Sequence, residues 1–341
     1  VGKCLQHNLK ITPVYEYAEN PYVSFFYRIN EKDYKVNVVP IAYVPNKTML
    51  NKALKISGMA RTPFHTTFAQ ENLEGLEDEV RLLKIFTKRK KVYGIFGLTG
   101  WLCELLVLNF GSFINVLKSA ERLDNAPIDI LNRHTTEELK KRFPHDHVII
   151  LDPIDVDRNA AAGIQGVMGE FKLKRFIANA QEGLRTPEVL FQPLQIPYNV
   201  EITFRKLQTE IIETNLYTFL GGVIGKLKSS LLPYGYHLED AYININKPSI
   251  LLLFDKVKQS IGWKRGPPLS MSKAVEQFRK THRNSNFRQN KGYIWIKQAP
   301  KYVTIEQAIK DHIEILKGYL KIQAINTYAM IKINNLQEEI Y

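Results

Sequence analysis

The hydrophobic pattern changes its period twice along this sequence, which restricts the folds that the chain can adopt. Residues 1–45 read as strands, with extended runs at 21–29 and 34–44 on either side of the polar turn Asn-Glu-Lys-Asp. Between 69 and 185 the apolar residues recur at three- and four-residue steps, which is typical of helices. From 199 onward the pattern predicts a strand, a helix and two further strands. The chain is therefore predicted to belong to the α+β class.

Local signals predict the individual elements. The spacing of Leu73, Leu76, Val80 and Leu83 places one apolar face on a helix over 69–91. Ser112 is expected to cap a helix within 111–123, because a serine oxygen can accept from a free amide of the first turn. Further helices are expected at 99–110, 167–183, 208–231 and 271–283 and from about 304, and further strands at 199–205, 236–245, 249–257 and 293–297.

The composition is that of a globular protein. Of 341 residues, 45% are hydrophobic and 24% are charged, so the chain can bury several cores. Its two cysteines, Cys4 and Cys103, exclude a disulfide framework and favour a reducing cytoplasm. The longest apolar run, 102–110, is interrupted by Glu104 and is about half as long as a bilayer requires. With no signal peptide recognisable at the N-terminus, we expect a cytoplasmic chain with no membrane partner.

The charge of the chain points toward a polyanionic partner. Lys and Arg total 47 against 34 acids, a net charge of +13, although an AT-rich coding bias can also enrich lysine. The excess is densest over 263–291, where Glu276 is the single acid. The basic residues there are Lys264, Arg265, Lys273, Arg279, Lys280, Arg283, Arg288 and Lys291, interleaved with Trp263, Phe278 and Phe287. Cations bind phosphates and aromatic faces accept unstacked bases, so this stretch is predicted to bind RNA rather than to be only a solvated face.

Several unrelated short motifs also occur together and in a recognisable order. They are YAENPYV (17–23), VNVVP (36–40), RTPFH (61–65), RLLK (81–84) with VYG (92–94), TGWLCELL (99–106) and DPIDVDRNAAA (152–162). In order and spacing the chain resembles the archaeal-type, class I CCA-adding enzymes, the tRNA nucleotidyltransferases of the polymerase-β-like superfamily. The resemblance runs from about residue 10 to at least 320.

The resemblance implies an architecture and a partner. It implies a remnant of a polymerase-β-like palm sheet at 1–66, a helical neck at 67–190, a small α+β body at 191–262 and a basic α+β tail at 263–341. It also implies that the chain binds tRNA or a tRNA-like RNA, and it makes a homodimer the expected assembly.

Catalysis in this family implies two divalent metals held by three carboxylates. Two of the carboxylates belong to a strand led by a Gly-Ser motif, which we expect to lie upstream of Val1. The third position is occupied by Asn37, and an amide is a poorer magnesium ligand than a carboxylate. Unless Asn37 is only a surface strand residue, we predict a chain without a metal site or catalytic residues. Mg²⁺ with CTP or ATP would bind if a complete head were supplied.

The nucleotide-binding residues that the resemblance implies are mostly present. They are Arg61, Thr62, His65, Lys84, Tyr93 and Arg205. Lys84 and Tyr93 would contact the triphosphate, and Arg205 would recognise the base edge, to which a rigid fork of donors is suited. Taken without the family, Lys84 reads as a solvated helix residue, His65 as a capping or satisfied histidine, and Arg205 as an ordinary strand-end arginine.

Three other features read as structural. Asp152, Asp155 and Asp157 lack the glycine and distal glutamate of a calcium loop, so we expect Asp and Asn of this segment to cap the next helix. Gly94, Gly97 and Gly100 recur at steps of three, unlike a dinucleotide fingerprint, and are expected to lead into a buried helix. Cys103 is expected to be inert core.

Three functions therefore stay open. The first is a tRNA-binding chain that is not catalytic alone. The second is a tRNA nucleotidyltransferase, adding CCA to tRNA 3′ ends, whose acid-pair strand comes from a small partner chain or from residues missing from this sequence. The third is a structural RNA-binding subunit of a ribonucleoprotein. Fold analogy cannot choose among them, because function resides in the site.

Overall fold

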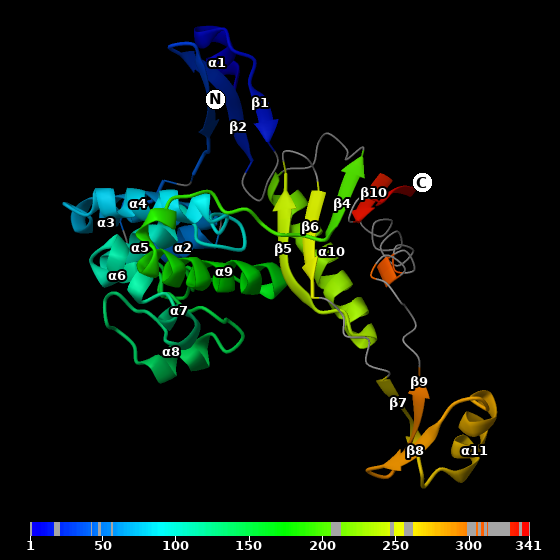
Figure 1. Ribbon diagram of the computed structural model, residues 1–341. Coiled ribbons are helices and arrows are strands. Elements are labelled where there is room, and N and C mark those ends of the chain that lie inside the picture. Colours follow the sequence, from blue (N-terminus) through cyan, green and yellow to red (C-terminus); the bar gives the residue numbers. More distant parts are fainter. Residues whose placement is uncertain are drawn as a thin grey trace. The chain divides into compact units, whose positions relative to one another are not determined.

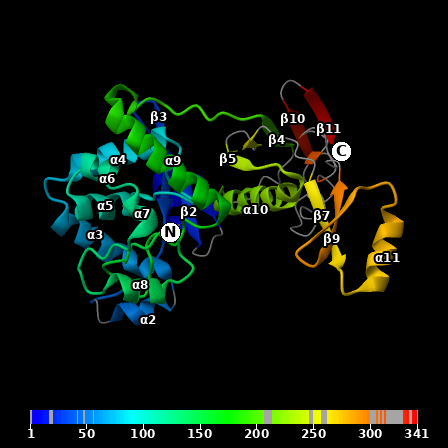
Figure 2. The ribbon, with the colours of Figure 1, turned by 60° about the horizontal axis from the view of Figure 1, so that its bottom comes forward.

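The computed structural model describes most of the chain. The described residues are 2–16, 21–41, 43–46, 49–55, 57–205, 213–245, 249–255, 262–298, Ile305, Ala308, Ile309, His312, 328–333 and 336–340. They divide into a first unit, 1–195 with 210–217, and a second unit, 196–209 with 218–341 (Figures 1 and 2). Across the described residues the elements are mixed helices and antiparallel strands, which confirms the α+β class. None of the described helices is long and apolar enough to cross a membrane.

The first unit begins with helix α1 (Gly2–Leu9) and a three-stranded antiparallel sheet. Its strands are β1 (Val14–Glu16), β2 (Tyr22–Ile29) and β3 (Lys32–Val38), in the order β1-β2-β3. The predicted hairpin is confirmed, but its turn is shorter than expected. Asn30 and Glu31, with φ of 46° and 62°, form a two-residue turn whose twist matches that of the strands. The strand prediction for 1–45 is wrong at α1, where the sequence has no alternation.

Helices make up most of the rest of the first unit. They are α2 (Leu50–Leu54), α3 (Thr62–Asn72), α4 (Glu77–Arg89), α5 (Gly100–Phe110), α6 (Phe113–Lys118), α7 (Arg122–Asn125), α8 (Thr136–Arg142) and α9 (Gly166–Arg185), with 3₁₀ turns at Gly58–Arg61 and Pro187–Val189. The single helix predicted over 69–91 is wrong, because Gly75 adopts a φ of 80° and separates α3 from α4. The Ser112 cap is confirmed: its side chain accepts from the amide of Asn115 at 3.2 Å.

The core of this unit surrounds α5, which is buried on most of its faces. The ring of Phe86 meets the rings of Phe113 and Phe176 edge-on, with centroids 5.7 and 6.1 Å apart. Each such ring contributes about 2–3 kcal/mol of apolar burial. Cys103 is fully buried here, and burial raises the pKa of its thiol to about 12, whereas Cys4 is exposed on α1. Cys103 is therefore inert core, as predicted.

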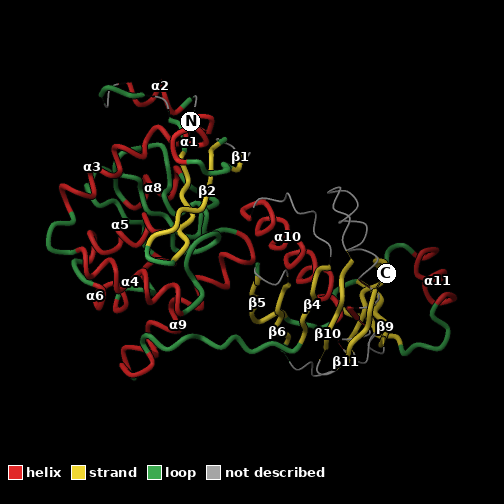
Figure 3. The backbone as a smooth tube through the Cα atoms, turned by 90° about the horizontal axis from the view of Figure 1, so that it is seen from above, coloured by secondary structure: helices red, strands yellow, loops and turns green. Residues whose placement is uncertain are grey.

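The second unit contains a five-stranded antiparallel sheet in the order β11-β10-β4-β6-β5. The strands are β4 (Val200–Arg205), β5 (Leu238–Asn244), β6 (Ser249–Phe254), β10 (Tyr328–Ile333) and β11 (Leu336–Ile340). Figures 1 and 3 show α10 (Glu213–Leu231), which leads into a 3₁₀ turn at Leu232–Tyr234, along one face of this sheet. Buried Ile202, Ile250 and Leu252 line the sheet, and buried Leu220 and Ile224 line the helix.

A smaller sheet with one helix follows in the second unit. Its strands are β7 (Gly262–Pro268), β8 (Phe287–Asn290) and β9 (Tyr293–Gln298), in the order β7-β9-β8, and its helix is α11 (Ser272–Thr281). The predicted helix at 271–283 and strand at 293–297 are confirmed. Residues 262–298, which hold these elements, are called the β7–β9 module below. Most of the helix predicted from about 304 lies outside the described residues.

Candidate functional site

Lys84 lies on α4 and Tyr93 in the turn that follows this helix, and their side chains meet at the start of α5. A Cβ atom placed on Gly100 would lie 3.2 Å from the Tyr93 hydroxyl and 3.8 Å from the Lys84 Nζ atom. The glycine thus leaves a small space open between an ammonium, a hydroxyl and the amide-rich end of a helix. Such an arrangement suits an anion, because cation and helix dipole act in the same sense. Lys84 also donates to Glu104 Oε1 at 2.7 Å, so this ion pair holds the ammonium in place.

The turn that carries Tyr93 is held by hydrogen bonds from α9. Lys172 Nζ donates to the carbonyl oxygens of Tyr93 and Ile95, at 3.1 and 2.7 Å. Burial, reinforced by the nearby charge of Arg175, lowers the pKa of Lys172 to about 8. Gly97 closes the turn so tightly that a Cβ there would lie 2.0 Å from the carbonyl oxygen of Val92. The position of the Tyr93 hydroxyl therefore depends on the nearby Gly97 and on Lys172, which is distant in sequence.

His65, another predicted nucleotide contact, lies between an aromatic ring and a carboxylate. Its ring stacks on Trp101, with centroids 4.1 Å apart, and its Nε2 atom lies 3.0 Å from both oxygens of Asp152. Because an ionised carboxylate only accepts, Nε2 carries the proton. Trp101 directly follows Gly100, so His65 is connected through one ring to the helix end beside Lys84 and Tyr93.

Asp152 accepts hydrogen bonds from several residues of this region. Its side chain is fully buried and also accepts from Arg158 Nη1 at 2.7 Å and from the amides of Ile154 and Asp155. Burial by itself would raise the pKa of Asp152, but the hydrogen bonds from His65 and the two amides outweigh it and hold this pKa well below its usual range. Asp155 pairs with Arg61, the 3₁₀ residue before α3, and the exposed Thr62 begins that helix.

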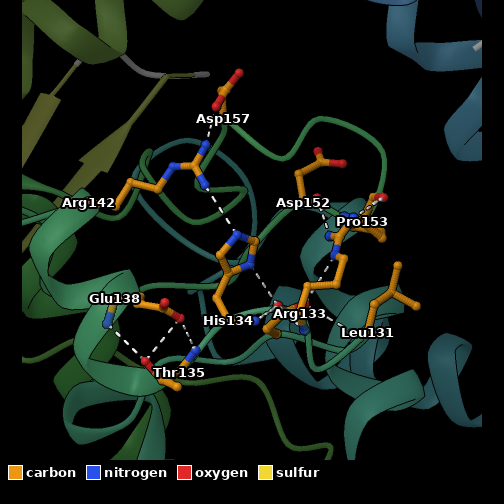
Figure 4. Close-up of polar contacts among 10 residues, drawn as sticks. Leu131, Arg133, His134, Thr135, Glu138, Arg142, Asp152, Pro153 and Asp157 are labelled. Atoms are coloured by element: carbon orange, nitrogen blue, oxygen red, sulfur yellow. Dashed lines mark hydrogen bonds and ion pairs between the residues drawn. The ribbon is translucent and has the colours of Figure 1, made fainter. Parts of the chain in front are cut away.

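A second network holds the same loop from the side of α8 (Figure 4). Arg133 donates to the carbonyl oxygens of Asp152 and Pro153, at 3.4 and 3.3 Å. His134 Nδ1 lies 3.2 Å from Asp129 Oδ2, and its Nε2 atom faces Arg142 at 3.5 Å. Arg142 in turn pairs with Asp157. Residues 152–158, called the Asp152 loop below, are therefore clamped between these side chains and those of Arg61 and His65.

One detail of the Asp152 loop differs from expectation. The next helix, α9, has Gln165 at its N-cap without a side-chain bond, so the prediction that Asp and Asn of this segment cap it is wrong. Instead Asn159 Oδ1 accepts from the amides of Ile150 and Ala161, both at 2.9 Å. The Asn159 side chain thus joins the strand-like segment before the loop to the residues after it, ahead of the start of α9.

The donors around Asn37 do not fit a magnesium site. Asn37 is exposed on β3 and lies opposite Ser24 of β2, so the pair offers an amide and a hydroxyl. Hard divalent cations prefer carboxylate oxygens. Within the ranges that the structure describes, no group of three or more His, Cys, Asp or Glu side chains could hold a metal ion.

The remaining predicted site residues lie in the second unit. Arg205 ends β4, where its backbone is paired with Tyr328 of β10, and its side chain lies outside the described part of the chain. Its role in base recognition stays a prediction. The basic residues of the β7–β9 module are all exposed: Lys264, Arg265, Lys273, Arg279, Lys280, Arg283, Arg288 and Lys291. That exposure leaves their charges accessible to a large anion.

Sequence reasoning missed the residues that support the predicted ones. Trp101, Glu104 and Lys172 contact His65, Lys84 and the Tyr93 turn, respectively. Trp101 and Glu104 lie inside the TGWLCELL motif, whose residue types alone could have drawn attention to them. Lys172 carries no such signal, because it reads as one more lysine on an amphipathic helix.

The chain is similar in sequence to known proteins of one family. Residues 78–192 match the family model described as tRNA nucleotidyltransferase, second domain. The chain is 28% identical over 285 residues to the CCA-adding enzyme of Picrophilus torridus, covering 81% of the chain and 63% of the relative. It is 27% identical over 338 residues to that of Archaeoglobus fulgidus, covering 92% and 71%, and 38% identical over 176 residues to that of Thermoplasma acidophilum, covering 49% and 37%.

The alignment with the Picrophilus enzyme spans less than two thirds of that relative's own length. The model match covers the part of the chain in which Lys84, Tyr93 and the Asp152 loop lie. The chain is a homologue of the archaeal CCA-adding enzymes, the class I tRNA nucleotidyltransferases, over most of its length.

Proposed function

We propose that this chain binds tRNA, or an RNA shaped like its acceptor half, and that alone it does not add nucleotides. The observation that carries the proposal is the β7–β9 module, whose eight named basic side chains are all exposed. Release of counterions from RNA phosphates by such a surface is the main source of affinity for nucleic acid. Homology to CCA-adding enzymes makes tRNA the first RNA to test.

The absence of catalysis is proposed from Asn37. It is exposed on β3 and offers an amide where the resemblance implies a carboxylate. Two magnesium ions need several carboxylates to be held near a triphosphate. The decisive measurement is incorporation of labelled CMP and AMP into tRNA lacking CCA, with Mg²⁺, CTP and ATP and this chain alone. Robust addition of nucleotides would refute the proposal.

RNA binding is tested separately from catalysis. Charge reversal at Arg279 and Lys280, which are exposed on α11, should weaken tRNA binding at least tenfold in a fluorescence anisotropy titration. Lys84→Ala is the matched control, because Lys84 faces the start of α5 and should hardly affect tRNA affinity. Equal affinities for the parent and the charge-reversal variant would exclude α11 as the RNA contact.

A second candidate is a nucleotidyltransferase whose acid-pair strand comes from a partner chain or from residues outside this sequence. It is favoured by the intact arrangement of Lys84 and Tyr93 around Gly100, which a chain that only binds RNA does not need. The two candidates differ in nucleotide affinity, measured by calorimetry with Mg²⁺. The first predicts that ATP and CTP bind far more weakly than tRNA, whereas micromolar magnesium-dependent ATP binding would favour the second.

The third candidate, a structural subunit of a ribonucleoprotein, predicts a different RNA. If it holds, the native protein co-purifies in a stoichiometric ratio with a large RNA rather than with tRNA. Sequencing the RNA recovered with the native protein distinguishes these outcomes.

A further inference from the structure

Strand register in the β7–β9 module aligns three side chains across the sheet. Arg265 of β7 and Arg288 of β8 are both paired with Trp295 of the central strand β9. Side chains of directly paired residues point to the same face of a sheet. Arg265, Trp295 and Arg288 therefore form a single row, called the Trp295 row below.

The Trp295 row lies on the face away from α11. The neighbours of Trp295 along β9, Ile294 and Ile296, are buried and point to the opposite face, since side chains alternate along a strand. A Cβ on Gly266 would meet Phe278 of α11 and Ile294, which shows that α11 packs on that opposite face. Figures 1 and 2 show α11 to one side of this sheet.

The row is built from planar groups held in place. The Arg288 guanidinium lies 5.6 Å from the centroid of the Trp295 ring, and that of Arg265 lies 4.3 Å from the centroid of Tyr293. Trp295 Nε1 donates to the carbonyl oxygen of Asn290 at 3.0 Å, which fixes the tilt of the indole. Arg265 and Arg288 are exposed, so flat cationic and aromatic surfaces are presented together.

The charge of this face is of one sign. Arg265 and Arg288 lie on this face, and so does Lys297, two residues after Trp295, whereas Lys264 pairs with Ile296 and lies on the opposite face. The sequences of β7, β8 and β9 contain no acid. A face that served only to attract phosphates would not require tryptophan and tyrosine between its cations. Bases that are not stacked within a duplex bind to aromatic rings and to arginine planes, while their phosphates meet the surrounding cations.

We propose that the Trp295 row binds an unstacked nucleotide of an RNA ligand, with the base lying on the indole and guanidinium planes. The inference rests on the proposed RNA binding and adds which part of the RNA this face takes. The four cations Lys273, Arg279, Lys280 and Arg283, on α11 and just after it, would then meet the phosphate backbone on a separate surface of the module. Paired RNA offers no free base face along its length, so this site selects an unpaired or splayed nucleotide.

The test uses the full chain and three RNAs. They are a tRNA transcript lacking CCA, single-stranded oligoadenylate, and a blunt RNA duplex with the same number of phosphates. Trp295→Ala should weaken the binding of tRNA and oligoadenylate by roughly 5- to 100-fold and leave duplex binding unchanged. Arg288→Lys keeps the charge and removes the plane, so it should also weaken the first two RNAs selectively. Lys280→Ala should weaken all three to a similar extent.

Fluorescence supplies a readout that does not depend on affinity. The chain has three tryptophans, so the signal of Trp295 is taken as the difference between the parent and Trp295→Phe. A stacked base quenches indole emission, and we expect quenching by tRNA and oligoadenylate but not by duplex. Circular dichroism melts establish that each variant is folded, and Trp295→Leu replaces Trp295→Ala if the latter unfolds.

Two results separate the inference from the proposed function. If the parent binds tRNA but folded Trp295→Ala or Trp295→Leu binds it equally well and Trp295 is not quenched, the stacking site is wrong and RNA binding stands. If the parent binds none of the three RNAs, the proposed function falls, and the stacking site with it.

Discussion

Asp152 receives more hydrogen bonds than its two neighbouring aspartates because it joins two parts of the first unit. Its buried carboxylate accepts from His65, from Arg158 and from two amides of its own loop. A carboxylate that is buried and fully paired stabilises the fold, and loss of its charge leaves the partners without compensation.

Replacing Asp152 with Asn should therefore destabilise the chain by about 2–4 kcal/mol at pH 7. Urea denaturation of parent and variant measures the difference. Asp157→Asn is the control, because the side chain of Asp157 is 78% exposed and a surface pair contributes about 0–1 kcal/mol. Equal losses for the two variants would contradict the role given to Asp152.

The same residue predicts a dependence on pH. The pKa of Asp152 is lower in the folded chain than its ordinary value of about 3.9 in the unfolded chain. The ionised Asp152 carboxylate therefore contributes its full stabilisation of the fold above pH 5, and this stabilisation is lost as the pH falls below about 4. The stability gap between parent and Asp152→Asn should be constant from pH 7 to 5 and should narrow at pH 4 and below. If the difference in stability widened on acidification, folding would raise the pKa of Asp152 rather than lower it.

Asn37 gives a prediction with a negative outcome. Asn37→Asp adds one carboxylate to the exposed edge of β3, next to Ser24. Because one carboxylate cannot hold two metals, the variant should show no incorporation of CMP or AMP into tRNA lacking CCA. Activity in this variant, with none in the parent, would mean that other acids of the chain already complete the site.

At the scale of elements, the turn between α4 and α5 depends on Gly97. A methyl group there would lie 2.0 Å from the carbonyl oxygen of Val92 and 2.9 Å from the side chain of Lys172. Gly97→Ala should cost about 1–3 kcal/mol in thermal or urea denaturation, because backbone rather than a mobile side chain must move. Gly163→Ala is the matched control: nothing lies within 4 Å of its added Cβ, and stability should change by less than about 0.5 kcal/mol.

The β2–β3 hairpin carries strain at one residue. Glu31 adopts a φ of 62° at the second turn position, where glycine is strongly preferred. Glu31→Gly should stabilise the hairpin by about 0.5–1 kcal/mol, which would slow amide exchange in β2 and β3 about two- to fivefold. Glu31→Ala keeps the left-handed strain and should not slow exchange.

The elements that the sequence predicts well are those with long periodic patterns. Helices α5 and α9 and strands β4, β5 and β6 have bounds near those expected, because their apolar spacing is uninterrupted. Strands β7 and β8 were missed, since β7 contains two prolines and two glycines and β8 has four residues without alternation. Those strands exist because they pair with β9, and a pairing partner is not visible in a local pattern.

At the candidate site, too, the sequence indicates some residues and does not indicate those that hold them in place. Motif order indicated Lys84, Tyr93 and His65, and the structure brings the first two to Gly100 and stacks the third on Trp101. What holds them could not be predicted, because the contacts of Lys172 with the Tyr93 turn and of Asp152 with His65 each join residues more than 70 positions apart. Such contacts depend on tertiary packing.

For the molecule as a whole, the net charge of +13 is unevenly distributed, with a dense share on the β7–β9 module. Each phosphate contact adds about 0.9 to the slope of log affinity against log salt. The double variant Arg279→Gln with Lys280→Gln should therefore reduce the slope for tRNA by about 2, measured between 50 and 200 mM KCl. Lys52→Gln, an exposed change on α2, should leave the slope unaltered. A slope that falls equally in both variants would indicate attraction by net charge alone.

The contrast between the two thiols has a practical consequence for every such measurement. Cys103 is sealed in the core around α5 with a pKa of about 12, whereas Cys4 is exposed on α1. A maleimide dye at neutral pH should attach at Cys4 alone, since the thiolate is the reactive species and the buried thiol neither ionises nor meets the reagent. The natural chain thus accepts one fluorophore at a known position in its first unit. Energy transfer to a dye on RNA bound at the Trp295 row can be recorded without altering a single residue.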